Sequence, residues 1–232
     1  MYKKKSLGQH FLSNPHYLGL IADTVEIKAG ETVVEIGPGE GTLTAELLKR
    51  GAKVIALEKD SRLIDFLKEK FAGQDIEVIE GDALDYEPPK TYKVVGNIPY
   101  YISGALFKKF LTEKNQPSTL VFLVQKEVAE RIARSKKESI LSLSVKAYGE
   151  PKYIKTVPSG AFAPPPKVDS AILAVRGISR DNFKNAAHEK NFFELVKKAF
   201  GQKRKMLHST IGIDSNERPE DLALAEWLIL SA

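Results

Sequence analysis

The sequence predicts an α/β protein with a parallel sheet, followed by a small all-helical C-terminal domain. From residue 32 to about residue 125, strand-like apolar runs alternate with helix-like runs, which is typical of parallel strands joined by crossover helices. Residues 120–124 are apolar throughout, as expected for a central strand buried on both faces. From about residue 178 only helical periodicity remains. A chain of 232 residues can hold one such domain and a small appendage, but hardly two full domains.

The expected elements follow one another along the chain. Strands are predicted at short apolar runs, namely residues 33–36, 53–57, 76–79, 92–95 and 120–124. Helices are predicted at residues 43–50, 61–71, 103–111, 126–134 and 140–148. Two β-rich runs, residues 153–157 and 170–175, flank residues 158–166, which are too rich in proline for regular structure. C-terminal helices are expected at residues 191–200, 203–210 and 219–230. A polar linker at residues 179–184 then predicts a catalytic domain of residues 1–178 and a helical domain of residues 179–232.

The composition excludes several classes of site. Cysteine is absent, so disulfides, thiolate nucleophiles and cysteine-ligated zinc are excluded. The four histidines include no pair at the i, i+4 spacing of a helical metal site, and we predict no metal. No apolar run reaches membrane-spanning length, and Met1 to Lys5 do not lead into the apolar core of a signal peptide. We therefore expect a cytoplasmic protein with no membrane partner.

The segment Asn97-Ile98-Pro99-Tyr100 follows a predicted strand and has the chemistry of a pocket for a nucleobase amine. The Asn97 amide oxygen can accept a hydrogen bond from an exocyclic amine. Pro99 fixes a turn whose carbonyls can accept another, and Tyr100 offers a ring for stacking. Taken alone, the same residues are also typical of an ordinary turn after a strand with a packed aromatic residue.

A glycine-rich loop, Glu35 to Gly41, lies between the first predicted strand and its helix, where Gly37 and Gly39 would let a ligand approach the backbone. The loop lacks the third glycine of a nicotinamide fingerprint and the Lys-Ser/Thr of a Walker A loop. Acidic residues stand at three successive strand ends, as Glu35, Glu58 and Asp82. They suit an amine-bearing nucleoside ligand better than a phosphate, with Glu58 placed for ribose hydroxyls, although strand-end turns also favour acids.

Basic residues form clusters within a net charge of +5. The clusters with few balancing acids are residues 3–5, the cations of residues 126–137, Lys197 and Lys198, and Lys203, Arg204 and Lys205. They are consistent either with RNA contacts or with ordinary solvated helix faces.

Together these motifs resemble the rRNA adenine N6-dimethyltransferases of the KsgA type, related to the erythromycin-resistance rRNA methyltransferases. The resemblance rests on residues 5–12, the loop of residues 35–41, Glu58, Asp82, residues 97–100 and residues 162–170. It implies a Rossmann-like methyltransferase sheet that binds S-adenosylmethionine, without metal, and a monomer that acts on small-subunit rRNA in ribosome biogenesis.

The resemblance also assigns residues by position. The implied cofactor-binding residues are His10, Leu12, Glu35, Gly37, Gly39, Glu58, Asp82 and Asn97. The implied catalytic residues are Asn97, Pro99, Tyr100 and Phe162, with Phe162 as a second aromatic wall facing Tyr100. The implied RNA-binding residues are Lys203, Arg204 and Lys205.

The expected reaction is dimethylation of N6 on two adjacent adenines in the 3′-terminal hairpin of 16S rRNA. Asn97 and a carbonyl of the 98–99 turn would accept the N6 hydrogens and orient the nitrogen lone pair. The aromatic rings would stabilise the developing positive charge. Two alternatives stay open: a methyltransferase acting on large-subunit (23S) rRNA or DNA, and a non-catalytic RNA-binding assembly factor.

Overall fold

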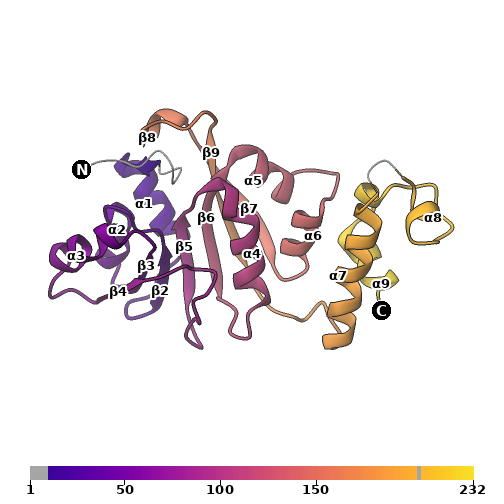
Figure 1. The fold of residues 1–232 in the computed structure, drawn as a ribbon, viewed down its shortest axis with the longest axis horizontal. Helices are drawn as coiled ribbons and strands as arrows, with labels where there is room; N and C mark the ends of the chain where they lie inside the picture. Colours follow the sequence, from indigo (N-terminus) through magenta and orange to yellow (C-terminus); the bar gives the residue numbers. More distant parts are fainter. Residues whose placement is uncertain (1–9, 203–204) are drawn as a thin grey trace.

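A central β-sheet organises the molecule. In the computed structural model, residues 10–202 and 205–232 are described, and within them a seven-stranded sheet has the order β4-β3-β2-β5-β6-β9-β7 (Figure 1). The strands β2 (Thr32–Ile36), β3 (Lys53–Glu58), β4 (Ile76–Glu80), β5 (Lys93–Asn97) and β6 (Thr119–Gln125) are parallel. β9 (Ser170–Arg176) runs antiparallel to both β6 and β7 (Glu150–Val157). The predicted α/β class is confirmed.

Both faces of the sheet are covered. Along β6, Leu120, Phe122 and Val124 belong to one hydrophobic cluster, whereas Val121 and Leu123 belong to another. We call the face with Val121 and Leu123 the α1 face, because α1 (Pro15–Thr24) and α2 (Thr42–Lys49) pack there. The remaining helices of this part are α3 (Ser61–Lys70), α4 (Ser103–Thr112), α5 (Lys126–Ala133) and α6 (Ile140–Lys146). The continuous apolar run of β6 is thus explained by burial on both sides.

Two features that involve the N-terminal segment were not predicted. α1 begins with Pro15 at its first position, and the Asn14 side chain caps it by accepting a hydrogen bond from the His16 amide. The proline-rich segment is also more regular than predicted, because β8 (Phe162–Ala163) pairs antiparallel with β1 (Phe11–Leu12). A two-residue ladder between segments so distant in the chain leaves no local periodicity in the sequence.

The C-terminal helices differ from the predicted bounds. α7 (Ala186–Phe200) begins five residues early, because the Asn185 side chain caps it by accepting from the His188 amide. The helix predicted at residues 203–210 is observed as α8 (Leu207–Thr210), with Lys203 and Arg204 outside the described residues. The helix predicted at residues 219–230 is interrupted by extended backbone at Leu222, which separates the 3-10 turn η4 (Pro219–Asp221) from α9 (Leu224–Leu230).

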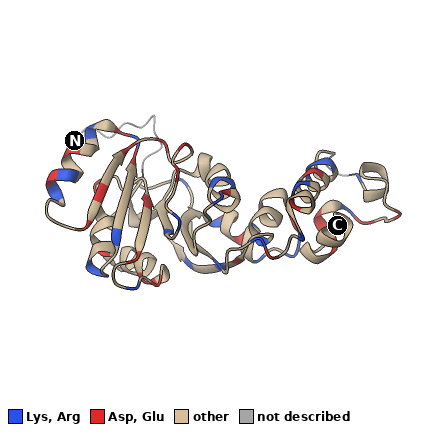
Figure 2. Cartoon of the chain, turned by 90° about the horizontal axis from the view of Figure 1, so that it is seen from below, with Lys and Arg blue, Asp and Glu red and all other residues tan. Residues whose placement is uncertain are grey.

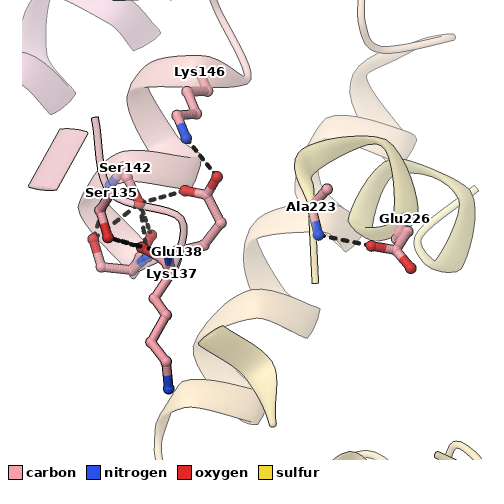
Figure 3. Close-up of polar contacts among 8 residues, drawn as sticks. Ser135, Lys137, Glu138, Ser142, Lys146, Ala223 and Glu226 are labelled. Atoms are coloured by element: carbon pink, nitrogen blue, oxygen red, sulfur yellow. Dashed lines mark hydrogen bonds and ion pairs between the residues drawn. The ribbon is translucent and has the colours of Figure 1, made fainter. Parts of the chain in front are cut away.

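The C-terminal helices pack against the sheet domain at α6, beside which α7 lies in Figure 1. The rings of Tyr148 and Phe193 stack with centroids 5.8 Å apart. The loop before α6 adds polar contacts: the Glu138 amide donates to the Glu220 carbonyl over 2.7 Å. The Glu138 carboxylate accepts from Lys146 and Ser142 (Figure 3). One hydrophobic cluster thus continues from the sheet into these helices, and the boundary at residue 178 stays a prediction.

Candidate active site

A cavity of about 500 Å³ lies at the carboxyl edge of the parallel strands. Its lining includes residues at the ends of β2, β3, β4 and β5, among them Gly37, Glu58, Asp82 and Asn97. In open α/β sheets, ligands bind at this edge. The topology therefore brings together four of the residues that the sequence singled out.

Two glycines of the loop after β2 serve different purposes. Gly37 has φ +65°, and a Cβ placed there would meet nothing within 4 Å, so its backbone is open to the cavity. At Gly39 a Cβ would lie 2.6 Å from the ring of Phe11. Gly37 can therefore let a ligand approach the backbone, whereas Gly39 lets the N-terminal segment lie against the loop.

Glu58, the last residue of β3, presents a buried and fixed carboxylate. One oxygen accepts a hydrogen bond from the Gly39 amide at 3.1 Å, and the other accepts from the Asp60 amide at 2.9 Å. The side chain lines the cavity. Each carboxylate oxygen retains acceptor capacity for a ligand hydroxyl.

Asp82 follows β4 and holds a similar position. Its oxygens accept from Lys59 Nζ at 2.8 Å and from the Leu84 amide at 3.0 Å. The ammonium of Lys59 lowers the pKa of Asp82, and the amide hydrogen bond acts in the same direction, so the side chain is ionised at neutral pH. Asp82 can accept a hydrogen bond from a ligand amine.

Glu35 corrects the expectation of a direct ligand contact. Its carboxylate is buried and accepts from Thr44 Oγ1 at 2.6 Å, and the side chain is absent from the cavity lining. Burial raises its pKa to about 7, with the nearby Glu58 charge acting in the same direction. Glu35 therefore supports the glycine-rich loop from behind, because its side chain points from β2 toward α2.

Asn97 is the last residue of β5, and its side-chain amide is held in place by a hydrogen bond. Its Nδ2 donates to the His10 carbonyl at 2.9 Å, and no described residue donates to its Oδ1. The bond orients the amide, so Oδ1 remains an acceptor for a target amine. Pro99 lines the cavity, but its carbonyl already accepts from the Ile102 amide at 3.2 Å inside the following 3-10 turn η2 (Tyr100–Ile102).

Tyr100 is held by a distant residue. Its Oη shares a 2.7 Å hydrogen bond with Ser170 Oγ on β9, and burial raises the pKa of the phenol, so it stays protonated. The ring facing Tyr100 belongs to His10, with centroids 6.4 Å apart and planes inclined by 20°. The His10 Nδ1 lies 2.9 Å from the Pro164 carbonyl, which requires a hydrogen on that nitrogen.

Phe162 and Leu12 correct two further expectations. Neither lines the cavity; both are buried in the cluster beneath α1, where β8 and β1 pair. Because side chains alternate along a strand, this pairing turns Phe162 and Leu12 to the core and leaves Phe11 at the cavity. In this structure His10, and not Phe162, forms the second ring beside Tyr100.

The sequence also missed two residues at the cavity. Lys59 pairs with Asp82, and Tyr101 lines the cavity with 76% of its surface exposed. The signal for Tyr101 was its position directly after Tyr100. Among the described residues, no group of His, Asp and Glu is placed to hold a metal ion, and no helix is long and apolar enough to cross a membrane.

Within the described part of the chain, only some cations of the predicted basic clusters are free to contact RNA. Lys205 is exposed, whereas Lys203 and Arg204 fall outside the described residues. In the cluster of residues 126–137, Arg131 pairs with Glu127, Arg134 lies 3.7 Å from the centre of the Tyr153 ring, and Lys137 binds Glu220 and Asp221. Figure 2 shows that basic and acidic residues are interspersed along the chain. The cluster has internal partners that its sequence neighbourhood did not reveal.

Comparison with known proteins gives consistent matches. The model of the ribosomal RNA adenine dimethylase family matches residues 1–225. A Dehalococcoides mccartyi (strain CBDB1) protein named ribosomal RNA small subunit methyltransferase A is 40% identical, with 97% of this chain and 86% of that protein covered. A Fusobacterium nucleatum protein of the same name is 37% identical, with 98% and 96% covered.

Two solved structures share the fold. The 23S rRNA methyltransferase ErmE superposes with a TM-score of 0.80 at 28% identity, covering 95% of this chain and 98% of that chain. A dimethyladenosine transferase from Plasmodium falciparum superposes with a TM-score of 0.79 at 34% identity, covering 88% and 76%.

Proposed function

The chain belongs to the ribosomal RNA adenine dimethylase family, and we propose that it dimethylates N6 of two adjacent adenines in the 3′-terminal hairpin of small-subunit (16S) rRNA. One observation carries this proposal. Asn97, with its amide oriented by the His10 carbonyl, lines the same cavity as Tyr100, Glu58 and Asp82. An acceptor for an aromatic amine and a nucleoside-binding edge thus share one site.

The residues present fit S-adenosylmethionine as the methyl donor. A cavity of about 500 Å³ lies within the range of roughly 300–1,000 Å³ common for small-molecule sites. Glu58 would accept from the ribose hydroxyls and Asp82 from the adenine amine, with Gly37 allowing close approach to the backbone. When bound, S-adenosylmethionine supplies an electrophilic methyl group on a sulfonium centre.

The chain's own residues would prepare the target nitrogen. Adenine N6 is a poor nucleophile, because its lone pair is delocalised into the ring. Asn97 Oδ1 would accept one N6 hydrogen and favour a tetrahedral nitrogen whose lone pair leaves that conjugation. Tyr100 would stack on the base and stabilise the cationic nitrogen by about 0.5–2 kcal/mol until its surplus proton is lost.

The choice of small-subunit rRNA rests on the sequence relatives. Several relatives that cover nearly all of this chain carry the small-subunit name, whereas the structural likeness to ErmE leaves large-subunit RNA as the alternative to test. We further propose a monomeric cytoplasmic protein acting in ribosome biogenesis, with an RNA-binding helical domain at residues 179–232. That domain would include the contacts of Lys203, Arg204 and Lys205.

A methyl-transfer assay tests the proposal. Asn97→Ala should lower transfer of labelled methyl to undermethylated small subunits by about 10²–10³-fold, because the amine loses its acceptor, while cofactor binding is partly retained. Asn115→Ala is the matched control, since Asn115 also donates from its amide to a carbonyl, that of Pro88, away from the cavity.

Three outcomes would contradict the proposal. Wild-type turnover by the Asn97→Ala variant would contradict the catalytic role proposed for Asn97. Methyl transfer by the wild-type protein only to large-subunit RNA or DNA would show that the proposed substrate is wrong. Absence of transfer to any of them would favour a non-catalytic assembly factor. Mapping the product nucleotide by mass spectrometry identifies the modified atoms.

A further inference from the structure

The edge strand β7 contains an irregularity that gathers two lysines on one face. Lys152 and Lys155 are three residues apart, a spacing that places side chains on opposite faces of a regular strand. The register with β9 shifts between Tyr153 and Lys155, so that Lys152 opposes Ala174 and Lys155 opposes Ile172. A bulge of this kind inserts one residue and moves the following side chains to the other face.

The neighbours on β9 identify that face. Ala174 and Ile172 both belong to the cluster beneath α1, as does Val157 farther along β7. Tyr153, by contrast, packs against the opposite cluster and shares a hydrogen bond with Thr156. The side chains of Lys152 and Lys155 therefore share the α1 face of the sheet.

Neither lysine is committed to an internal partner. Both are exposed, and within the part of the chain that the structure describes neither forms an ion pair or a side-chain hydrogen bond. They differ in this from Arg131, Arg134 and Lys137, whose side chains have intramolecular partners. Two positive charges on one edge are thus available to an anion.

The register relates this edge to the candidate active site. Lys155 opposes Ile172, Ile172 opposes Leu123 on β6, and Leu123 opposes Asn97 on β5. The two ends of this row are three strand spacings apart, or about 14 Å at about 4.8 Å each. Residues in one row point to the same face, so Lys155 lies on the side of the sheet to which Asn97 points. That span places Lys155 within a few nucleotides of a base held at Asn97.

We propose that Lys152 and Lys155 form a contact for the phosphate backbone of the RNA substrate, a few nucleotides from the target base. This inference rests on the proposed function, because it requires an RNA whose base reaches Asn97. Lysines on an edge strand also serve to prevent sheet-to-sheet association. The bulge favours the RNA contact, because edge protection needs no common face, whereas a phosphate backbone needs two cations side by side.

The salt dependence of RNA binding tests the proposal. The double variant Lys152→Gln/Lys155→Gln and the wild type are titrated with a labelled small-subunit 3′ hairpin RNA at several salt concentrations, with fluorescence anisotropy as the readout. Loss of two phosphate contacts should reduce the slope of log K against log salt by about 1.4–1.8, since each contact contributes about 0.7–0.9. Cofactor affinity should stay unchanged.

The matched control is Lys53→Gln/Lys68→Gln, which removes the same charge. Both control lysines are exposed without side-chain partners among the described residues. Lys53 lies on β3, one strand in from the opposite edge of the sheet, and Lys68 lies on α3. An unchanged slope in the β7 variant, or an equal decrease in the control, would overturn the proposal. Self-association of the β7 variant in light scattering, with the wild-type slope, would assign the lysines to edge protection.

These outcomes are separable from failure of the proposed function. If the wild-type protein methylates large-subunit RNA instead, the same titration with that RNA still measures the slope. If Asn97→Ala loses methyl transfer as predicted but Lys152→Gln/Lys155→Gln keeps the wild-type salt slope, only the proposal of a β7 contact is contradicted.

Discussion

The cavity has two halves that are built in different ways. The cofactor half, formed by Gly37, Glu58 and Asp82, is fixed by partners near in sequence: Glu58 is bonded by amides 2 and 19 residues away. The target half, formed by His10, Asn97 and Tyr100, is fixed by partners 154, 87 and 70 residues away, respectively. The first half is completed within neighbouring strand-helix units, whereas the second requires that the N-terminal segment and β9 reach β5.

This difference implies that the halves can be disturbed separately. A substitution in the cofactor half should change cofactor affinity or the support of its loop. A substitution in the target half should change use of the RNA. The experiments on Glu58 and Ser170 below therefore measure both halves, and the experiment on Glu35 measures the support of the loop.

The largest expected effect concerns Glu35, which supports the loop of the cofactor half. Its pKa is raised from 4.5 to about 7 by burial. Between these values the folded protein binds more protons than the unfolded chain, so this group makes stability fall as pH rises from about 4.5 to about 7. Glu35→Gln removes this titration. As pH rises through the window, the unfolding free energy of the variant should therefore increase relative to that of the wild type by on the order of 3 kcal/mol.

Urea unfolding at a series of pH values measures this difference. Glu77→Gln is the control, because Glu77 is an exposed carboxylate on the neighbouring part of the sheet, on β4. A constant difference between Glu35→Gln and the wild type from pH 4.5 to 7.5 would contradict the assignment. The Gln side chain can still accept from Thr44, so the loop keeps its support.

The same contrast explains what the sequence could predict. Gly37, Glu58 and Asp82 were identifiable because each follows a strand of recognisable pattern, and the parallel topology brings such positions together. Asn97 was found for the same reason. Local pattern was thus sufficient to identify residues that end or follow a strand, but it did not identify the distant partner of Asn97.

The target half was less predictable, because its geometry depends on the pairing of β1 with β8. That ladder of two residues turns Phe162 into the core and brings His10 toward Tyr100. Neither segment carries strand periodicity, and the residues around Phe162 were expected to be irregular. The role of Ser170 as the partner of Tyr100 was likewise hidden, since the two residues are 70 positions apart.

The next effect in size tests the cofactor half directly. Glu58→Gln keeps the size of the side chain but removes the charge and one acceptor oxygen. Loss of a charge-assisted hydrogen bond of about 1.5–3 kcal/mol should weaken S-adenosylmethionine binding by about 12- to 140-fold. Calorimetric titration measures the affinity, and RNA binding should be unchanged. Weaker RNA binding with normal cofactor affinity would break the division into halves.

The smallest expected effect tests the target half. Ser170→Ala removes the partner of the Tyr100 hydroxyl while leaving the ring in place. Because the net contribution of such a bond is about 0.5–1.5 kcal/mol, kcat/KM for the RNA should fall by about 2- to 12-fold, with cofactor affinity unchanged. Steady-state methyl transfer at saturating cofactor gives the first quantity, and calorimetry gives the second.

A double-mutant cycle identifies the cause of that loss. Tyr100→Phe removes the same bond from the other side, and leaves the fully buried Ser170 hydroxyl without its partner. If the bond positions the ring, the double variant Tyr100→Phe/Ser170→Ala should be no worse than Tyr100→Phe alone, because the second change removes an interaction already lost. Additive losses would mean that Ser170 acts on the site by another route. In that case the long-range bond from β9 would not explain how the target half is assembled.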